Sequence, residues 1–279
     1  MSLEQQIGAL VKASENLTGA VNGKIGEIDK KVNIATSAVP EQIRKNMYVT
    51  RYVDASNGDD SRSGESKSNA KRSVQSALDS APVGSVIWCS LQNGQEHQIS
   101  SRIPCLNKTI IFSPWIYSSD RPTLRAVSYV EDGKCLIGTI MEPSGFHCYY
   151  VDVVIDDYFD TDSPVDGYRK GFLSNGDRPI SPNITIATGN LTHAGFPFVH
   201  SAGRPTLVSA LLFNCTYTRR DSKRGMTKMI ESVGGALYLT NFSMSNATHV
   251  DLINLTRDKY GVVTNWNSNF DFAAAVDGV

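Results

Sequence analysis

YVDASNGDDSRSG at residues 52–64, followed by SNAKRSVQSALDSAPVGSVIW at residues 68–88, decides how the rest of the chain is interpreted. The first stretch starts extended and then reaches Asn57-Gly58, a strong turn signal. Asp59 and Asp60 follow, but the alternating oxygen ligands and the distant glutamate of a calcium loop are missing. We therefore expect a turn after a short strand and no metal site.

The second stretch predicts a short helix and then a buried strand. Val74, Ala77 and Leu78 share one helical face, and a proline and a glycine follow within six residues. The apolar run over 85–91 is typical of a buried strand. The order is thus strand, glycine-containing turn, short helix and strand.

The first forty residues show a different pattern. Apolar residues recur at alternating steps of three and four, which is a heptad seam and predicts a coiled coil. Two steps of four in succession between Val21 and Ile25 form a stutter. We expect Pro40 to end the helix, because proline is poorly tolerated inside one. The seam consists of Leu3, Ile7, Leu10, Leu17, Val21, Ile25, Ile28, Val32 and Val39.

A single amphipathic helix lying on its own domain is the alternative. Gly8, Gly19, Gly23 and Gly26 lie within the helical pattern, and each costs about 1 kcal/mol relative to alanine. Such a helix needs packing partners, either sister chains or a larger assembly. The register leaves dimers and trimers open, since adjacent isoleucines in the seam favour trimers whereas leucines mixed with β-branched residues favour dimers.

Residues 101–270 consist of short strand-like runs separated by Asn, Gly, Asp and Ser, which is typical of a mainly β architecture. Several asparagines lie near the ends of these runs, where tight corners favour them. We expect three parts: a helical anchor over 1–46, a connector with the first strand and short helix over 47–84, and a β body over 85–279. A β-sandwich remains an alternative for the body.

Composition excludes several classes of protein. The net charge is −1, with 27 basic and 28 acidic residues, so no nucleic-acid surface is expected. No stretch is long and apolar enough to insert into a membrane, and the N-terminus lacks the pattern of a secretion signal. The five cysteines are scattered and have no zinc spacing, so we expect buried thiols, a cytoplasmic site of synthesis and no cofactor.

Two resemblances extend these expectations over about residues 1–100. The order YVD, NGDD, short helix and APVGSVIW resembles the entrance of a pectin-lyase-like right-handed parallel β-helix, in which a helix covers the first coil. LVKASENLTGAVNGKIGEIDKKVN, followed by VPEQIRKNM, is similar to the virion-proximal helices of bacteriophage tail fibres and tailspikes. The resemblance implies a virion protein that is homotrimeric, docks on other tail or baseplate proteins, and recognises a host surface polysaccharide.

The densest acidic cluster is YYVDVVIDDYFDTDSPVDGY, which begins at Tyr149. Asp156, Asp157 and Asp160 are its candidate catalytic residues, because glycosidases use a pair of carboxyl groups, one as an acid and one as a base or nucleophile. The alternative is a solvated acidic loop between strands. No pair is chosen, since a sequence does not give the distance between carboxylates.

Candidate contacts with a glycan or a partner protein are basic and aromatic. They are Arg219, Arg220, Lys223 and Arg224 in YTRRDSKRGMTK, together with Trp115, whose ring offers a flat face to a sugar. Exposed loop cations and a packed tryptophan are the alternative.

Three functions follow from these expectations. A structural, receptor-binding spike is favoured. A polysaccharide-cleaving tailspike requires an exposed carboxylate pair in a groove. A free, exported polysaccharide lyase requires an export signal, which the N-terminus does not show.

Overall fold

A computed structural model describes residues 2–166, 170–176, 178, 181–201, 206–225, 227–248, 251–253, 255–256 and 264–269. The chain divides into two units, Met1–Asn46 and Met47–Val279. The described structure is mainly β, with 37% strand and 22% helix, and this confirms the expected class. Residues 270–279, the end of the expected body, lie outside the described residues.

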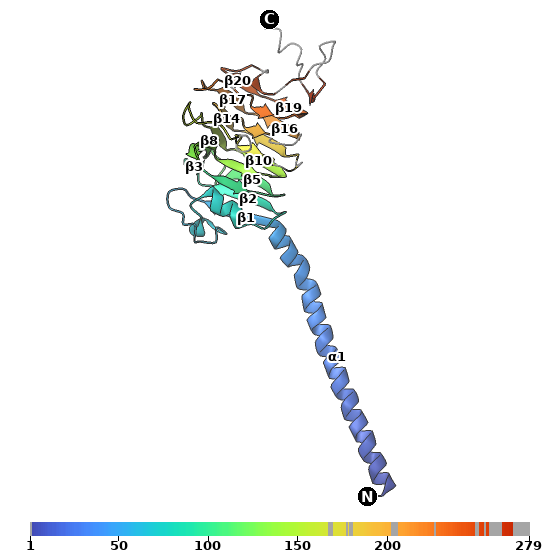
Figure 1. Ribbon diagram of the computed structural model, residues 1–279. Helices are drawn as coiled ribbons and strands as arrows, with labels where there is room; N and C mark the ends of the chain where they lie inside the picture. The colour runs from blue at the N-terminus through green and yellow to red at the C-terminus, as the bar shows by residue number, and fades with distance from the viewer. Residues whose placement is uncertain are drawn as a thin grey trace. The chain divides into compact units, whose positions relative to one another are not determined.

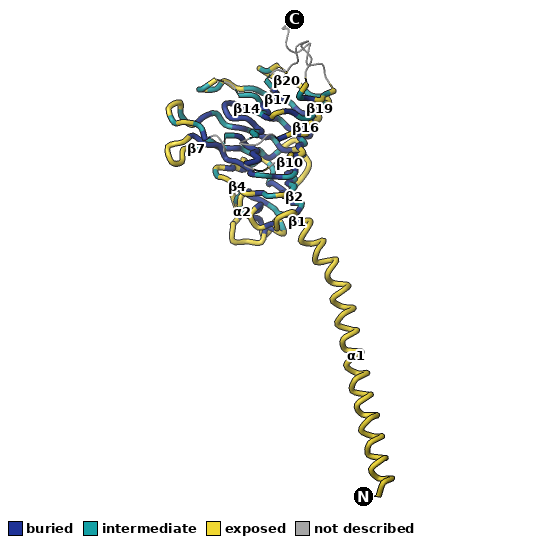
Figure 2. Tube along the Cα trace, turned by 45° about the vertical axis from the view of Figure 1, so that its right-hand side comes forward, coloured by how far each residue is buried: buried dark blue, intermediate teal, exposed yellow. Residues whose placement is uncertain are grey.

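Helix α1 runs over Leu3–Met47, and no described residue of it is buried (Figure 2). Pro40 lies inside this helix, so the prediction that Pro40 ends it is wrong. Proline removes one N–H and costs about 3 kcal/mol, but the freed carbonyl is exposed to water in this helix. The segment after it is helix-forming and carries an ion pair of 2.9 Å between Arg44 and Glu41, which offsets part of this cost.

Three parallel sheets build the second unit (Figure 1). Sheet A contains β1 (Tyr48–Val53), β2 (Val86–Leu91), β5 (Thr109–Pro114), β10 (Gly145–Tyr149), β13 (Asn183–Ala187), β16 (Leu207–Phe213), β19 (Gly234–Thr240) and β21 (Trp266–Ser268), in that order. Sheet B contains β3 (Glu96–Ile99), β6 (Thr123–Ala126), β11 (Asp152–Ile155), β14 (Asn190–His193), β17 (Thr216–Arg219) and β20 (Ser243–Ser245). Sheet C contains β4 (Arg102–Pro104), β9 (Thr139–Met141), β12 (Leu173–Ser174), β15 (Val199–His200) and β18 (Ile230–Glu231).

From β2 onward the chain passes from sheet A to B to C and back to A, and each strand pairs with the strand one circuit later. Between sheets B and C the chain also forms a hairpin of β7 (Ser128–Glu131) and β8 (Lys134–Ile137). Among the described strand pairings, only this one is antiparallel. Parallel pairing does not fit the antiparallel sheets of the alternative β-sandwich.

The core lies between the three sheets, because alternate residues of each strand point inward. In sheet A, Ile87, Ile110, Phe146 and Ile184 occupy matching positions on successive strands, and all four are fully buried. Phe146 also contacts Phe172 and Phe198 beside sheet C, with ring centroids 5.5 and 5.7 Å apart. All five cysteines are free and buried, as predicted.

One corner recurs between sheets A and B. Tyr150, Thr188, Asn214 and Asn241 each directly follow a strand of sheet A and have φ between 47° and 58°, the left-handed region. The Asn241 side-chain amide donates to Asn214 Oδ1 at 2.6 Å, and that of Asn214 donates to Thr188 Oγ1 at 3.3 Å. The prediction of asparagine corners is confirmed at Asn214 and Asn241, which form a ladder.

The opening stretch forms the predicted strand and turn. After β1, the loop returns beside it, since the Asp54 N–H donates to the Lys71 carbonyl at 2.8 Å. Gly58 is required here, because a Cβ at this position would lie 2.2 Å from the same carbonyl oxygen. Asp60 accepts bonds from the backbone N–H and hydroxyl of Ser73, at 2.8 Å each.

Ser73 in turn caps helix α2 (Val74–Asp79), accepting from the Ser76 N–H at 3.1 Å. The short helix predicted from its apolar face is therefore confirmed, and α2 contacts β1, β2, β3 and β4. The aspartates of this loop organise its backbone. No group of three or more His, Cys, Asp or Glu within the described residues is placed to hold a metal ion.

Candidate functional site

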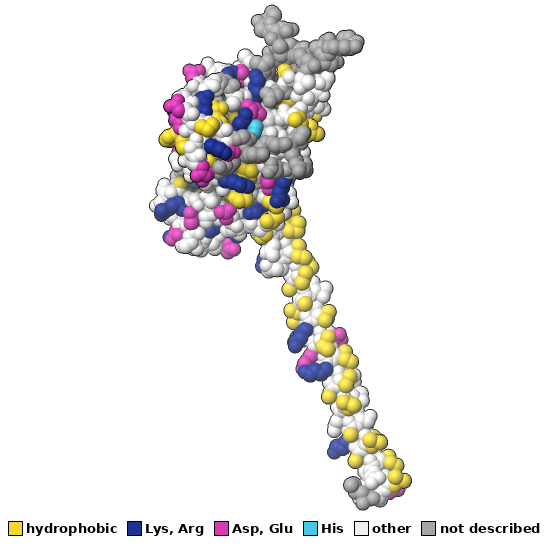
Figure 3. Space-filling view, in the orientation of Figure 1, with side chains coloured by type: hydrophobic (Ala, Val, Ile, Leu, Met, Phe, Trp, Pro, Cys, Tyr) yellow, Lys and Arg dark blue, Asp and Glu magenta, His cyan; other side chains and the backbone are white. Residues whose placement is uncertain are grey.

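The apolar seam of α1 is the first candidate site. The side chains of its nine predicted residues are between 48% and 72% exposed. Figure 3 shows hydrophobic side chains along the length of the helix. No described residue of this single chain covers them. Contiguous exposed apolar side chains of this kind are typical of interaction surfaces.

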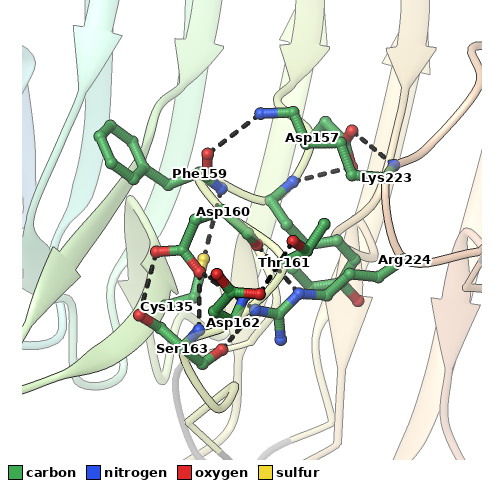
Figure 4. Close-up of polar contacts among 10 residues, drawn as sticks. Cys135, Asp157, Phe159, Asp160, Thr161, Asp162, Ser163, Lys223 and Arg224 are labelled. Atoms are coloured by element: carbon green, nitrogen blue, oxygen red, sulfur yellow. Dashed lines mark hydrogen bonds and ion pairs between the residues drawn. The ribbon is translucent and has the colours of Figure 1, made fainter.

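The second candidate site joins the two charged clusters, which sequence reasoning treated separately (Figure 4). The acidic loop leaves β11 and the basic loop leaves β17, and β14 lies between these two strands in sheet B. Both loops belong to the same corner of the circuit, from sheet B toward sheet C. Parallel stacking therefore places one above the other.

Asp157 and Asp160 hold the basic loop. Asp157 accepts a bond from Ser222 Oγ at 2.7 Å and one from the Lys223 N–H at 2.8 Å. Arg224 donates to the Asp160 carbonyl at 2.9 Å and forms an ion pair of 3.2 Å with its carboxylate. The Arg224 guanidinium also lies 5.3 Å from the centre of the Tyr158 ring, a cation–π contact.

The environment of Asp160 opposes a role as a general acid. Its carboxylate accepts bonds from the Ser163 N–H at 2.7 Å and the Asp162 N–H at 2.9 Å. The pKa of Asp160 is lowered below its ordinary value, mainly by the hydrogen bond from the Ser163 backbone. The bonds from the Ser163 hydroxyl and from Asp162, and the charge of Arg224, lower it further. A general acid needs the opposite shift, because it must carry a proton near neutral pH.

Asp156 has a different partner. It forms an ion pair of 2.8 Å with Arg125 of β6, and Arg125 also pairs with Glu96 of β3 at 3.1 Å. The three carboxylates proposed from the sequence are thus each engaged by protein donors. They do not form a free carboxylate pair.

A groove lies beside these contacts and encloses about 410 Å³. Arg125, Arg220 and Lys223 supply its cations, while Asp156, Asp157 and Asp221 supply its anions. Tyr158 and Phe159 also line the groove, and Phe159 is 60% exposed. The groove thus places hydrogen-bonding groups beside an exposed aromatic ring, a combination found in ligand-binding sites.

Some of the predicted basic side chains are bound to other protein groups, and one is exposed to solvent without a described ion pair. Arg219 forms an ion pair with Asp251, and the Lys223 ammonium donates to the Phe159 carbonyl at 3.0 Å. Arg220 is exposed, and its guanidinium makes no ion pair with any described residue. Of the four predicted cations, Arg220 is therefore the one best placed to bind a ligand.

Trp115 is held elsewhere and is not among the residues that line the groove. Its indole N–H donates to the Ser90 carbonyl at 2.9 Å, and the edge of its ring meets Tyr52 with centroids 6.0 Å apart. The Lys67 ammonium lies 5.5 Å from the ring centre. The structure does not bring Trp115 together with the basic loop.

No family model and no curated protein matches the chain. No helix among the described residues is both long enough and apolar enough to cross a membrane.

Proposed function

We propose that this chain is a structural, fibre- or spike-like component of a bacteriophage virion. In this proposal the chain is a homotrimer, its helix docks on the tail or baseplate, and its β unit contributes to recognition of a host surface polysaccharide. The observation that carries the proposal is the direct passage from a 45-residue helix with an exposed apolar seam into the first strand of a stack of parallel strands. Both features suit a rod built from several identical chains.

The repeated circuit of sheets A, B and C supports a right-handed parallel β-helix for the body. Short corners with left-handed residues and the Asn214–Asn241 ladder are features that suit a solenoid, since each circuit contacts only its neighbours. The contacts of α2 with the first strands support a capping role. A solenoid of this kind pairs its internal strands on both sides and is rigid, as a spike outside the cell must be.

The seam of α1 supports a parallel coiled coil of sister chains. Burial of apolar side chains is worth about 25 cal/mol per Å², so self-association stabilises a helix whose four glycines weaken it alone. Gly8, Gly19, Gly23 and Gly26 have no atom within 4 Å of a Cβ built on them, so nothing in the single chain requires glycine there.

The groove beside Arg220 supports polysaccharide recognition. The test is binding of the full chain to a panel of purified bacterial capsular and lipopolysaccharide glycans. Arg220→Ala should lower the affinity for a bound glycan at least tenfold, whereas Arg62→Ala, an exposed cation on the loop before α2, should leave it unchanged. Retention of full affinity by the Arg220 variant would exclude this groove as the glycan site.

A polysaccharide-cleaving spike is the second candidate, because Asp156 and Asp157 line the same groove. Their engagement by Arg125, Ser222 and Lys223 favours binding without cleavage. We expect no release of reducing ends or unsaturated products from the same glycan panel. Cleavage that is lost in Asp156→Asn, in a variant that stays folded, would establish the enzyme instead.

A further inference from the structure

The outward face of sheet A carries no charged side chain among its described positions. The strand register identifies which positions point outward, because neighbouring residues of a strand point to opposite sides of the sheet. The outward positions are Tyr48, Thr50, Tyr52, Val86, Trp88, Ser90, Thr109, Ile111, Ser113, Gly145, His147, Tyr149, Asn183, Thr185, Ala187, Leu207, Ser209, Leu211, Phe213, Gly234, Ala236, Tyr238, Thr240 and Asn267. Charged residues make up 20% of the chain, so about five are expected in a set of this size.

A column of large side chains runs through the middle of this face. Trp88, Ile111 and His147 occupy one position on successive strands, Thr185 follows on the next strand, and Leu211 and Tyr238 occupy the position further along the stack. Trp88, Leu211 and Tyr238 are 42%, 38% and 39% exposed. Large side chains that are partly exposed and aligned on one face are unusual on a monomer's surface.

Sheet B gives the contrast within the same molecule. Its outward positions include Glu96, Arg125 and Asp152. Glu96 and Arg125 form an ion pair with each other at 3.1 Å, and Asp152 pairs with Arg121 at 3.1 Å. A solvated face of this kind is the ordinary outcome. The lack of charge on sheet A is therefore a property of that face and not of the whole body.

We propose that the outward face of sheet A is the contact between the β units of sister chains. This inference rests on the proposed homotrimer and names the surface through which its bodies meet. Sister chains fit the face because three identical chains can turn it toward a shared threefold axis, and a face without charged side chains then meets its neighbours without repulsion between like charges. The seam of α1 also leads, at Tyr48, directly into β1 of this sheet, so one continuous segment of chain carries both surfaces.

The size of the face suits such a contact. Eight strands about 4.8 Å apart, with about three outward residues each, cover roughly 700 Å². A standard interface buries about 800 Å² per partner. In a trimer this face is shared between two neighbours, so each pairwise contact through it is smaller than the standard one, and the seam of α1 adds further contact area.

Cysteine cross-linking in the full chain tests the contact with a matched control. Thr185 in β13 and Thr192 in β14 belong to the same circuit, are both half-buried, and point outward from sheets A and B respectively. Each is changed to cysteine, and the five native thiols are buried. We expect a short bis-maleimide to give at least fivefold more covalent dimer with Thr185→Cys than with Thr192→Cys.

The sedimentation mass of each variant, measured first, separates the two proposals. A trimer that cross-links no better through Thr185→Cys overturns the proposed face and leaves the homotrimer standing. A monomer overturns both. Ser209→Cys in β16 repeats the measurement one circuit further along sheet A, so a folding defect at one position does not decide the result.

Discussion

Thr188 occupies a corner that suits a different residue. Its φ is 56°, and a β-branched side chain in the left-handed region is strained by about 1 kcal/mol. Asparagine already fills the equivalent corners one and two circuits later, at Asn214 and Asn241. We predict that Thr188→Asn extends the ladder and raises the free energy of unfolding by about 1 kcal/mol.

Thermal unfolding of the full chain measures this gain. The control is Thr192→Asn in β14, where asparagine is disfavoured in a strand and no gain is expected. An equal or lower midpoint for Thr188→Asn would show that the corner does not strain threonine.

His193 makes stability depend on pH. It is buried, its Nδ1 lies 2.8 Å from the Tyr217 hydroxyl, and burial lowers its pKa to about 4. An unfolded histidine has a pKa near 6.5, so the stabilisation is fully present above pH 6.5 and is lost as the pH falls toward 4. The full loss is about 3 kcal/mol, because one unit of pKa corresponds to about 1.4 kcal/mol.

Urea unfolding at pH 7.5 and pH 5 measures this dependence. His193→Gln should reduce the difference between the two midpoints. It should not abolish the difference, because burial also lowers the pKa of His97. An unchanged pH dependence in the variant would assign the effect to other groups.

At the scale of elements, Pro40 is the weak point of α1. It removes one backbone hydrogen bond from the helix, and all of its described neighbours in the helix are exposed. We predict that Pro40→Ala stabilises the associated helices by about 3 kcal/mol per chain, with higher helical ellipticity on heating. The matched control is Ala38→Gly, which should lower stability by about 1 kcal/mol. No gain in Pro40→Ala would indicate that the helix ends before Pro40.

The sequence predicts elements well where a local pattern determines them. The apolar face of Val74, Ala77 and Leu78 predicts α2, and corner asparagines predict turns that the backbone at Asn214 and Asn241 confirms. The end of α1 is predicted wrongly, because a local rule for proline ignores the helix-forming residues after Pro40 and the solvent around it. The pairing of Asp160 with Arg224 is missed, since it depends on two loops that parallel stacking brings together across 64 residues.

At the scale of the whole molecule, the same limit applies to sheet A. The absence of charged side chains from the described outward positions cannot be recognised until the register assigns Trp88, Leu211 and Tyr238 to one column. Read along the chain, these residues are ordinary members of apolar runs. Only the sheets show that they share a face and that their side chains are partly exposed there.

The central claim is that the chain acts as a trimer joined through α1, and the sedimentation mass of the full chain tests it most directly. We predict three times the 30.4 kDa mass of one chain. The double variant Ile25→Asn and Ile28→Asn should dissociate at concentrations where the native chain stays trimeric, whereas Lys30→Asn and Lys31→Asn should not. A native chain that sediments at 30.4 kDa across the accessible concentrations would contradict the account.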